Sequence, residues 1–187
     1  WPRLVTHDFN ENEHVAGPWN MASGGISACN RLIEIFTENL GEDATVVYEL
    51  RSLRAFYFYV LLSYFGNIPI EASFANANPA PSQVPPQEAF NFIEAELLAS
   101  VDQLLEDRNS TYAKVNKWVG YTILTQLYLN SERITGVPQW QKAAEAANAD
   151  GVFLSPVFPT ASHPGAEALG AADRIGSIEP GKRADLL

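Results

Sequence analysis

The chain has few cysteines, few cations and no long apolar run, and each shortage excludes a class of protein. One cysteine in 187 residues excludes an internal disulfide framework and a cysteine metal cluster. The 12 basic residues are outnumbered by 22 acidic ones, and the formal net charge of -10 repels phosphate backbones, so no nucleic-acid partner is expected. The longest strongly apolar stretch, residues 55–65, is about half of the roughly 20 residues that a membrane-spanning helix needs.

The composition is nevertheless that of a folded globular chain. Hydrophobic residues make up 47% of it and charged residues 18%, which is too apolar for a disordered chain. The sequence opens at Trp1 without a basic region followed by an apolar segment, so we expect any export signal or lipid anchor to be missing from this chain. The residues before Cys29 fit a lipoprotein cleavage site only superficially, and we expect Cys29 to be buried in a helix, where a free cysteine packs as a small hydrophobe.

Apolar residues recur every three or four positions in five segments, and this spacing predicts helices. The predicted helices cover about residues 19–40, 45–65, 87–107 and 114–130, followed by a short helix through Trp140 and Ala147. Gly41 and Gly66 are typical of helix ends. The Asn-, Ala-, Pro- and Ser-rich residues 67–86 predict an excursion loop of turns and extended backbone. Two antiparallel pairs and a fifth helix without a partner predict an all-α, tetratricopeptide-type helical repeat.

No arrangement of residue types in the sequence predicts catalysis. There is no Ser-His-acid order and no glycine-rich phosphate cradle. A catalytic metal needs about three clustered protein ligands, and His7, His14 and His163 do not have such spacing. We therefore predict no catalytic residue, no metal ligand and no cofactor.

Arg54 lies in the middle of a predicted helix, where an unpaired buried charge would be costly. It could clamp a ligand, or it could form a structural ion pair with a carboxylate such as Glu34 or Glu38 on the preceding helix. We favour the ion pair, because paired buried arginines commonly fix helix packing.

Aromatic residues in the nonhelical segments are the better candidates for contacting a ligand. Those of the second helix have helical spacing and are expected in the core first: Tyr57, Phe58, Tyr59, Tyr64 and Phe65. Trp1 and Phe74 could stack on a pyranose ring, and Asn76 and Asn78 could supply paired hydrogen bonds. A loop that binds nothing is an equally good interpretation of these four residues.

Four segments, in the same order and with the same spacing, resemble the tetratricopeptide-type part of the SusD-like (SusD/RagB) family. The four matching segments are residues 17–33, 49–58, 65–70 and 115–130. The most specific part of the resemblance is the run Arg54-Ala55-Phe56 in the second segment, followed by Phe65-Gly66-Asn67-Ile68-Pro69 in the third. The resemblance covers about residues 1–150, and since family members are much longer, we expect this to be a first portion only.

The resemblance implies a surface lipoprotein of the outer membrane of Bacteroidota-type bacteria. Such proteins bind oligosaccharides, are not enzymes, and act as a lid over a SusC-like TonB-dependent outer-membrane transporter. Their sugar contacts lie largely in variable loops and in the later half, so the resemblance assigns no binding residue here. It implies contact with the membrane only through a lipid anchor absent from this chain. The alternative is a helical-repeat adaptor that binds a polypeptide in its concave groove.

The resemblance changes after Asp150. Residues 151–170 resemble a strand and phosphate-proximal loop of thiamine-phosphate synthases, and residues 171–187 resemble the C-terminal strand segment of metal-dependent amidohydrolases. One strand and a loop cannot form a barrel of eight strands, so we expect neither activity. We expect residues 151–187 to be an irregular or extended tail of foreign sequence. On this view the chain is chimeric or misassembled, and as a composite it would have no native function.

Overall fold

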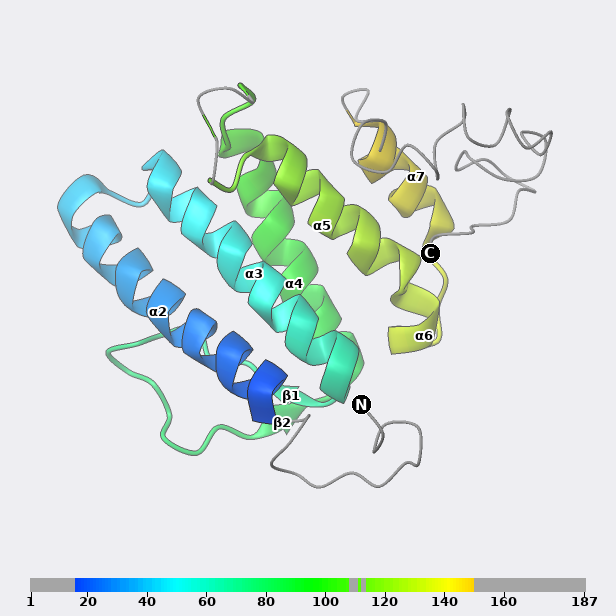
Figure 1. Cartoon of the computed structure of the whole chain (residues 1–187), viewed down its shortest axis with the longest axis horizontal. Helices are drawn as coiled ribbons and strands as arrows, with labels where there is room; N and C mark the ends of the chain where they lie inside the picture. The colour runs from blue at the N-terminus through cyan, green and yellow to red at the C-terminus, as the bar shows by residue number, and fades with distance from the viewer. Residues whose placement is uncertain (1–15, 108–110, 112–113, 150–187) are drawn as a thin grey trace.

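The computed structural model describes residues 16–107, 111 and 114–149, and they form an all-α fold, as predicted. The α-helices shown in Figure 1 are α2 (Ala16–Leu40), α3 (Thr45–Phe65), α4 (Pro86–Ser100), α5 (Lys117–Leu129), α6 (Ser131–Thr135) and α7 (Trp140–Asn148). A single 3₁₀ turn, η2 (Val101–Gln103), continues α4. The predicted tail lies outside the described residues, as do Trp1 and the three histidines.

Two glycines end the first helices, as the sequence predicts. Gly41 and Gly66 have φ angles of 90° and 74°, a left-handed conformation that residues with a Cβ rarely adopt. The Gly66 N–H donates to the Leu62 carbonyl at 3.1 Å, which closes the last turn of α3. The predicted helical end at residue 107 is wrong, because the chain tightens into η2 after α4 and becomes extended at Leu104.

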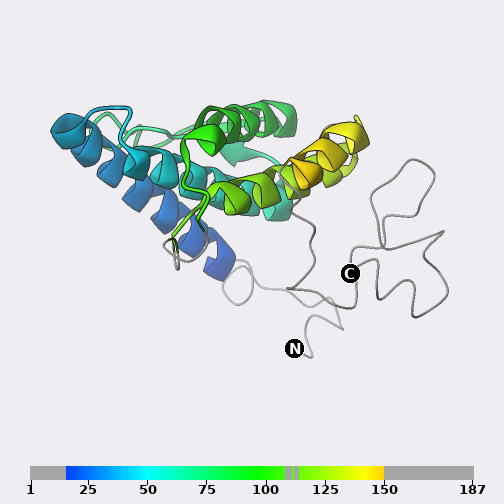
Figure 2. The same cartoon turned by 90° about the horizontal axis from the view of Figure 1, so that it is seen from above.

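The helices pack as antiparallel neighbours, as predicted, except that the last helix also has a partner (Figure 1). α3 packs against both α2 and α4, and Figures 1 and 2 show α2, α3 and α5 side by side with α4 behind them. The expectation that the last helix has no partner is wrong, because α7 packs along α5. Its contact residues Ala143 and Ala146 are buried, and their small side chains allow two helices to approach closely.

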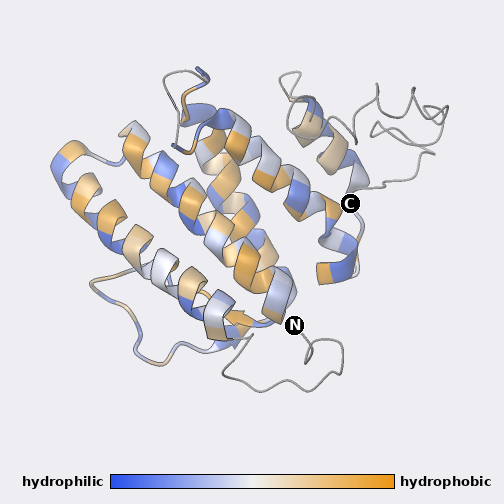
Figure 3. Ribbon diagram, viewed as in Figure 1, coloured by the Kyte–Doolittle hydropathy of each residue, from blue (hydrophilic) through white to orange (hydrophobic). Residues whose placement is uncertain are grey.

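The core lies where α3, α4 and α5 meet. Its largest fully buried hydrophobic side chains are Phe58, Leu61, Leu62, Ile68, Phe90, Ile93, Leu97, Leu124 and Leu127. Phe58 meets Phe92 edge to face at 5.2 Å between ring centroids, an arrangement that aromatic quadrupoles favour. Figure 3 shows hydrophobic residues over much of the C-terminal half of α3, as expected for a central helix. Cys29 is also buried, which confirms the prediction for this thiol.

The excursion loop is closed at its base by two very short strands. β1 (Ile68–Pro69) pairs antiparallel with β2 (Gln83–Val84), with Ile68 opposite Val84. Ile68 is fully buried and fixes this base to the helical core. The sequence predicts a loop here but not the ladder, since two residues are too few for an alternating pattern. Within the described ranges, no helix has the length and apolar content required to cross a bilayer.

Candidate functional site

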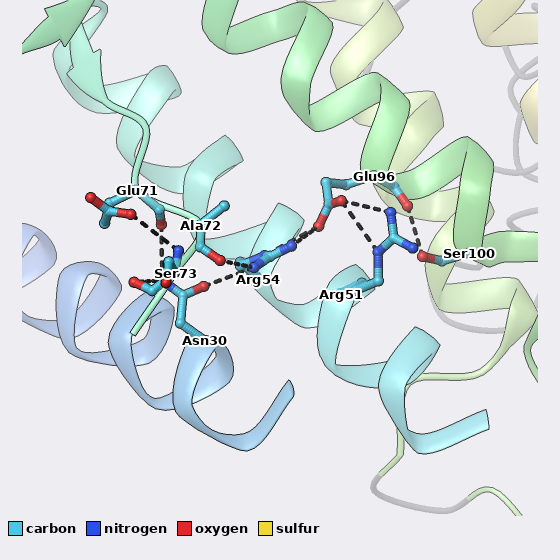
Figure 4. A network of polar contacts seen from close by, with 8 residues as sticks. All are labelled: Asn30, Arg51, Arg54, Glu71, Ala72, Ser73, Glu96 and Ser100. Atoms are coloured by element: carbon cyan, nitrogen blue, oxygen red, sulfur yellow. Dashed lines mark hydrogen bonds and ion pairs between the residues drawn. The ribbon is translucent and has the colours of Figure 1, made fainter. Parts of the chain in front are cut away.

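The polar residues of the core converge on Arg54 of α3, which is only 5% exposed. Its Nε donates to Glu96 Oε2 at 3.1 Å, its Nη2 donates to the same oxygen, and its Nη1 donates to Asn30 Oδ1 at 2.8 Å and to the Ala72 carbonyl at 2.9 Å. Arg51 donates to the other oxygen of Glu96 at 2.8 Å. Figure 4 shows this network running from α4 through α3 to the loop.

Arg54 therefore has a structural partner, but not the one expected. The sequence favours Glu34 or Glu38 on the preceding helix, whereas the ion pair is made with Glu96 on the following helix, α4. The physical reason lies in packing, because α3 is covered by α4 as well as by α2, and the carboxylate of Glu34 is occupied by loop backbone groups.

Asn30 of α2 carries the network from the core into the excursion loop. Its side chain is buried, and its Nδ2 donates to the carbonyls of Glu71 at 2.9 Å and Ser73 at 3.3 Å. Since its Oδ1 accepts from Arg54, every polar atom of this amide has a partner. The loop backbone at Glu71–Ser73 is thereby fastened to both α2 and α3.

Glu34, one helical turn after Asn30, holds the next part of the loop. Its carboxylate accepts hydrogen bonds from Ser73 Oγ at 2.9 Å, the Phe74 amide at 2.7 Å and the Ala75 amide at 3.0 Å. These donors, the Phe74 amide first, hold the pKa of Glu34 below its ordinary value, because they stabilise the ionised form. A helix side chain thus takes the place of a backbone acceptor for the loop.

A second carboxylate, from the loop itself, folds the segment back on itself. Glu71 accepts from the amides of Asn78 at 2.8 Å and Ser73 at 3.1 Å, and these bonds, that of Asn78 first, lower its pKa. Asn78 Oδ1 in turn accepts from the Ala80 amide at 3.0 Å. Residues 71–80 are therefore a compact turn rather than a free excursion.

The structure brings three of the four candidate ligand residues into this turn. Phe74 is 46% exposed, with the Arg31 guanidinium 5.8 Å from its ring centroid. Asn76 and Asn78 are exposed in the same turn, and the Asn76 backbone N–H donates to Ser73 Oγ. Trp1 lies outside the described residues.

This arrangement can recognise a ligand by shape and hydrogen bonding. An exposed ring and exposed side-chain amides in one turn suit a neutral, hydroxyl-rich molecule whose C–H face covers the ring. The carboxylates of Glu34 and Glu71 both accept hydrogen bonds from backbone amides of the turn. The described part of the chain holds no group of three His, Cys, Asp or Glu residues placed to bind a metal.

The sequence does not predict the residues that shape the turn. Asn30 and Glu34 are four apart, which places them on one helix face, and Asn30 is a polar residue beside the apolar stripe. This spacing indicates a polar site on α2. It does not identify the loop backbone as the partner of that site, because the loop is some forty positions away in the chain. The stacking of Arg31 near Phe74 has no sequence signal either.

No protein-family model matches the chain. By sequence, it is 29% identical over 100 residues to the starch-binding protein SusD of Bacteroides thetaiotaomicron, a match that covers 54% of this chain and 18% of SusD. By structure, it resembles a SusD homologue from the same organism with a TM-score of 0.67 and 24% identity, over 76% of this chain and 31% of the homologue. It also resembles a laminarin-binding SusD-like protein, with a TM-score of 0.57 and 20% identity, over 72% of this chain and 29% of that protein.

All three relatives are SusD or proteins described as related to it. The two solved structures are below 25% identity and establish a shared fold, while the match to SusD establishes a likeness in sequence. The chain spans less than a third of the length of each of these relatives. The names of two of them, SusD and the laminarin-binding protein, describe binding. The chain therefore resembles SusD in sequence over the stretch that aligns with it, and it resembles a SusD homologue in fold.

Proposed function

We propose that the chain binds oligosaccharides without catalysis, through the turn at residues 71–80. The observation that carries this proposal is the sequence match to a starch-binding protein, SusD. The laminarin-binding relative supports the same ligand class, since laminarin is also a glucan. The net charge of -10 favours neutral glycans over acidic ones, which it would repel.

The turn supplies the groups that sugar binding needs. Phe74 offers an exposed ring on a backbone held by Glu34, so little conformational entropy is lost when a pyranose covers it. The side-chain amides of Asn76 and Asn78 lie in the same turn and can donate to and accept from hydroxyl groups. We propose these three residues as ligand contacts.

Calorimetric titration of the chain with starch and laminarin oligosaccharides tests this function. We expect Phe74→Ala to weaken binding about tenfold or more, as for a central aromatic contact. The matched control is Tyr64→Ala, which should leave the affinity unchanged. The prediction that Tyr64 lies in the core is wrong, because its ring is 70% exposed near the end of α3. Equal effects of the two substitutions, or no binding of either sugar, would contradict the proposal.

We further propose that this binding takes place at the bacterial outer-membrane surface, in a complex with a SusC-like TonB-dependent transporter. The likeness to SusD supports this setting. Co-purification of an affinity-tagged form with a co-expressed SusC-like transporter tests the partner, and surface labelling of intact cells tests the location. A protein that is protected from labelling and purifies alone would contradict it.

The polypeptide-binding alternative has one observation in its favour. Four large hydrophobic side chains of α2 are more than one third exposed: Met21, Leu32, Ile35 and Leu40. Spacings near multiples of a helical turn place the first three on one side of α2, where an apolar peptide could dock. Replacing Leu32 by Ser should weaken peptide capture and leave sugar binding unchanged, so the two functions are separable.

The division of the chain is also a proposal. We propose that residues 1–150 form one portion of a longer SusD-like protein and that residues 151–187 do not belong to it. The small share of the relatives' length that the chain covers supports the first part. Peptide mass mapping across Ala149 to Val152 tests the second, because a junction absent from a single molecule would make the tail an assembly artefact.

A further inference from the structure

Side chains of α2 and α3 hold the backbone of residues 71–75 in place. Asn30 and Arg54 bind the carbonyls of residues 71–73, and Glu34 binds the amides of residues 74 and 75. Glu34 is the acceptor nearest to the proposed ligand contact, because one of its bonds is to the amide of Phe74 itself. The bond of 2.7 Å has the length expected for a charged acceptor.

We propose that Glu34 is a positioning residue, which fixes the backbone that carries the Phe74 ring before a ligand arrives. This inference rests on the proposed function, since it assigns a role in the same binding turn. Glu34 touches no ligand in this scheme and acts only through the backbone of residues 73–75. The recognition geometry of the loop is thus specified in part by helix α2.

The geometry favours Glu34 for this role over other groups of the turn. Its two carboxylate oxygens satisfy two consecutive backbone amides and the Ser73 hydroxyl, which fixes both the direction and the rotation of the chain at Phe74. Two consecutive amides that share one acceptor side chain cannot swing independently. A ring attached between them is therefore preorganised, and preorganisation raises affinity by reducing the entropy lost on binding.

Hydrogen exchange tests the positioning itself. In the full 187-residue chain, Glu34→Ala should speed exchange of the Phe74 and Ala75 amides about tenfold to a hundredfold, the loss expected for hydrogen bonds to a charged group. Glu34→Gln keeps one acceptor oxygen and should restore part of the protection. Glu38→Ala, which removes an exposed carboxylate one turn further along α2, is the control and should leave these amides unchanged. Unchanged exchange in Glu34→Ala would overturn the inference.

A double-mutant cycle tests the consequence for binding. Glu34→Ala should weaken sugar binding several-fold in the wild-type chain and have no further effect in a Phe74→Ala background, because its action passes through that ring. Equal effects in both backgrounds would overturn the positioning role. The failures are distinguishable: a wild-type chain that binds no sugar refutes the proposed function, whereas a Phe74-dependent affinity that ignores Glu34 refutes only this inference.

Discussion

The guanidinium of Arg54 on α3 and the carboxylate of Glu96 on α4 form a buried ion pair that joins the two central helices. Both residues are less than 9% exposed, and Arg54 Nη1 donates to Asn30 and to a loop carbonyl, so every side-chain nitrogen of Arg54 has an acceptor. A buried pair is expensive to desolvate, and its stability depends on such complete pairing. The pair thus links helix packing to the shape of the turn at residues 71–80.

Breaking this pair from one side should be strongly destabilising. We expect Glu96→Leu to lower the free energy of unfolding by about 3–5 kcal/mol, because it leaves Arg54 buried without a carboxylate. The double variant Arg54→Met with Glu96→Leu should recover much of this loss, since apolar replacement of both partners removes the unpaired charge. Urea unfolding monitored by circular dichroism measures both. Additive losses in the double variant would contradict the interpretation.

Two adjacent glycines in α2 should respond oppositely to the same substitution. Gly24 is exposed and an added Cβ would meet nothing within 4 Å, so Gly24→Ala should stabilise the chain by about 0.5–1 kcal/mol through helix propensity. At Gly25 the Cβ would lie 2.5 Å from the Tyr57 ring, so the ring must move. We expect Gly25→Ala to be about 1–3 kcal/mol less stable than Gly24→Ala.

Thermal or urea unfolding of the two alanine variants provides this comparison. Replacing Tyr57 by Ala removes the overlapping ring, so in that background Gly25→Ala should gain stability as Gly24→Ala does. A Gly25→Ala variant as stable as Gly24→Ala in the presence of Tyr57 would show that the two helices do not approach as described.

The turn should hold its shape through mildly acidic conditions and lose it only at lower pH. The pKa values of Glu34 and Glu71 are lowered, chiefly by the amides of Phe74 and Asn78 respectively. A depressed folded-state pKa contributes stability that is present above the unfolded value of about 4.3 and is lost as the pH falls through the folded value. Both carboxylates are therefore ionised and bonded at neutral pH.

Amide chemical shifts of Phe74 and Ala75, followed by NMR from neutral pH downward, measure this transition. We expect its midpoint below the ordinary pKa of a glutamate side chain, and we expect Glu34→Gln to remove it. A midpoint at or above the ordinary value would contradict the prediction, because it would mean that these amides do not favour the ionised carboxylate.

The helices were predictable from the sequence because their signals are local. Apolar spacing locates α2 and α3, and Gly41 and Gly66 mark their ends, since the left-handed backbone there favours glycine. The end of α4 was not predictable in the same way. Leu104 continues the apolar stripe of the helix, yet it reaches the core from an extended backbone after η2.

The candidate site was predictable only as a loop with polar and aromatic residues. The sequence predicts that Phe74, Asn76 and Asn78 are outside helices, but their arrangement depends on contacts with Glu34 of α2 and Glu71 of the loop that no local pattern encodes. The same limit explains the wrong partner for Arg54. Its need for a carboxylate follows from burial, whereas the choice of Glu96 follows from which helix covers that side of α3.

The short ladder between β1 and β2 closes the base of the excursion loop. Because the strands join the two ends of the excursion directly, the distance between α3 and α4 does not depend on how many residues lie between Pro69 and Gln83. We expect insertions or deletions in that interval to be tolerated where the ladder closes and residues 71–73 keep their carbonyl contacts with Asn30 and Arg54. The exposed part of the turn beyond these contacts can therefore vary in sequence without requiring the helices to repack.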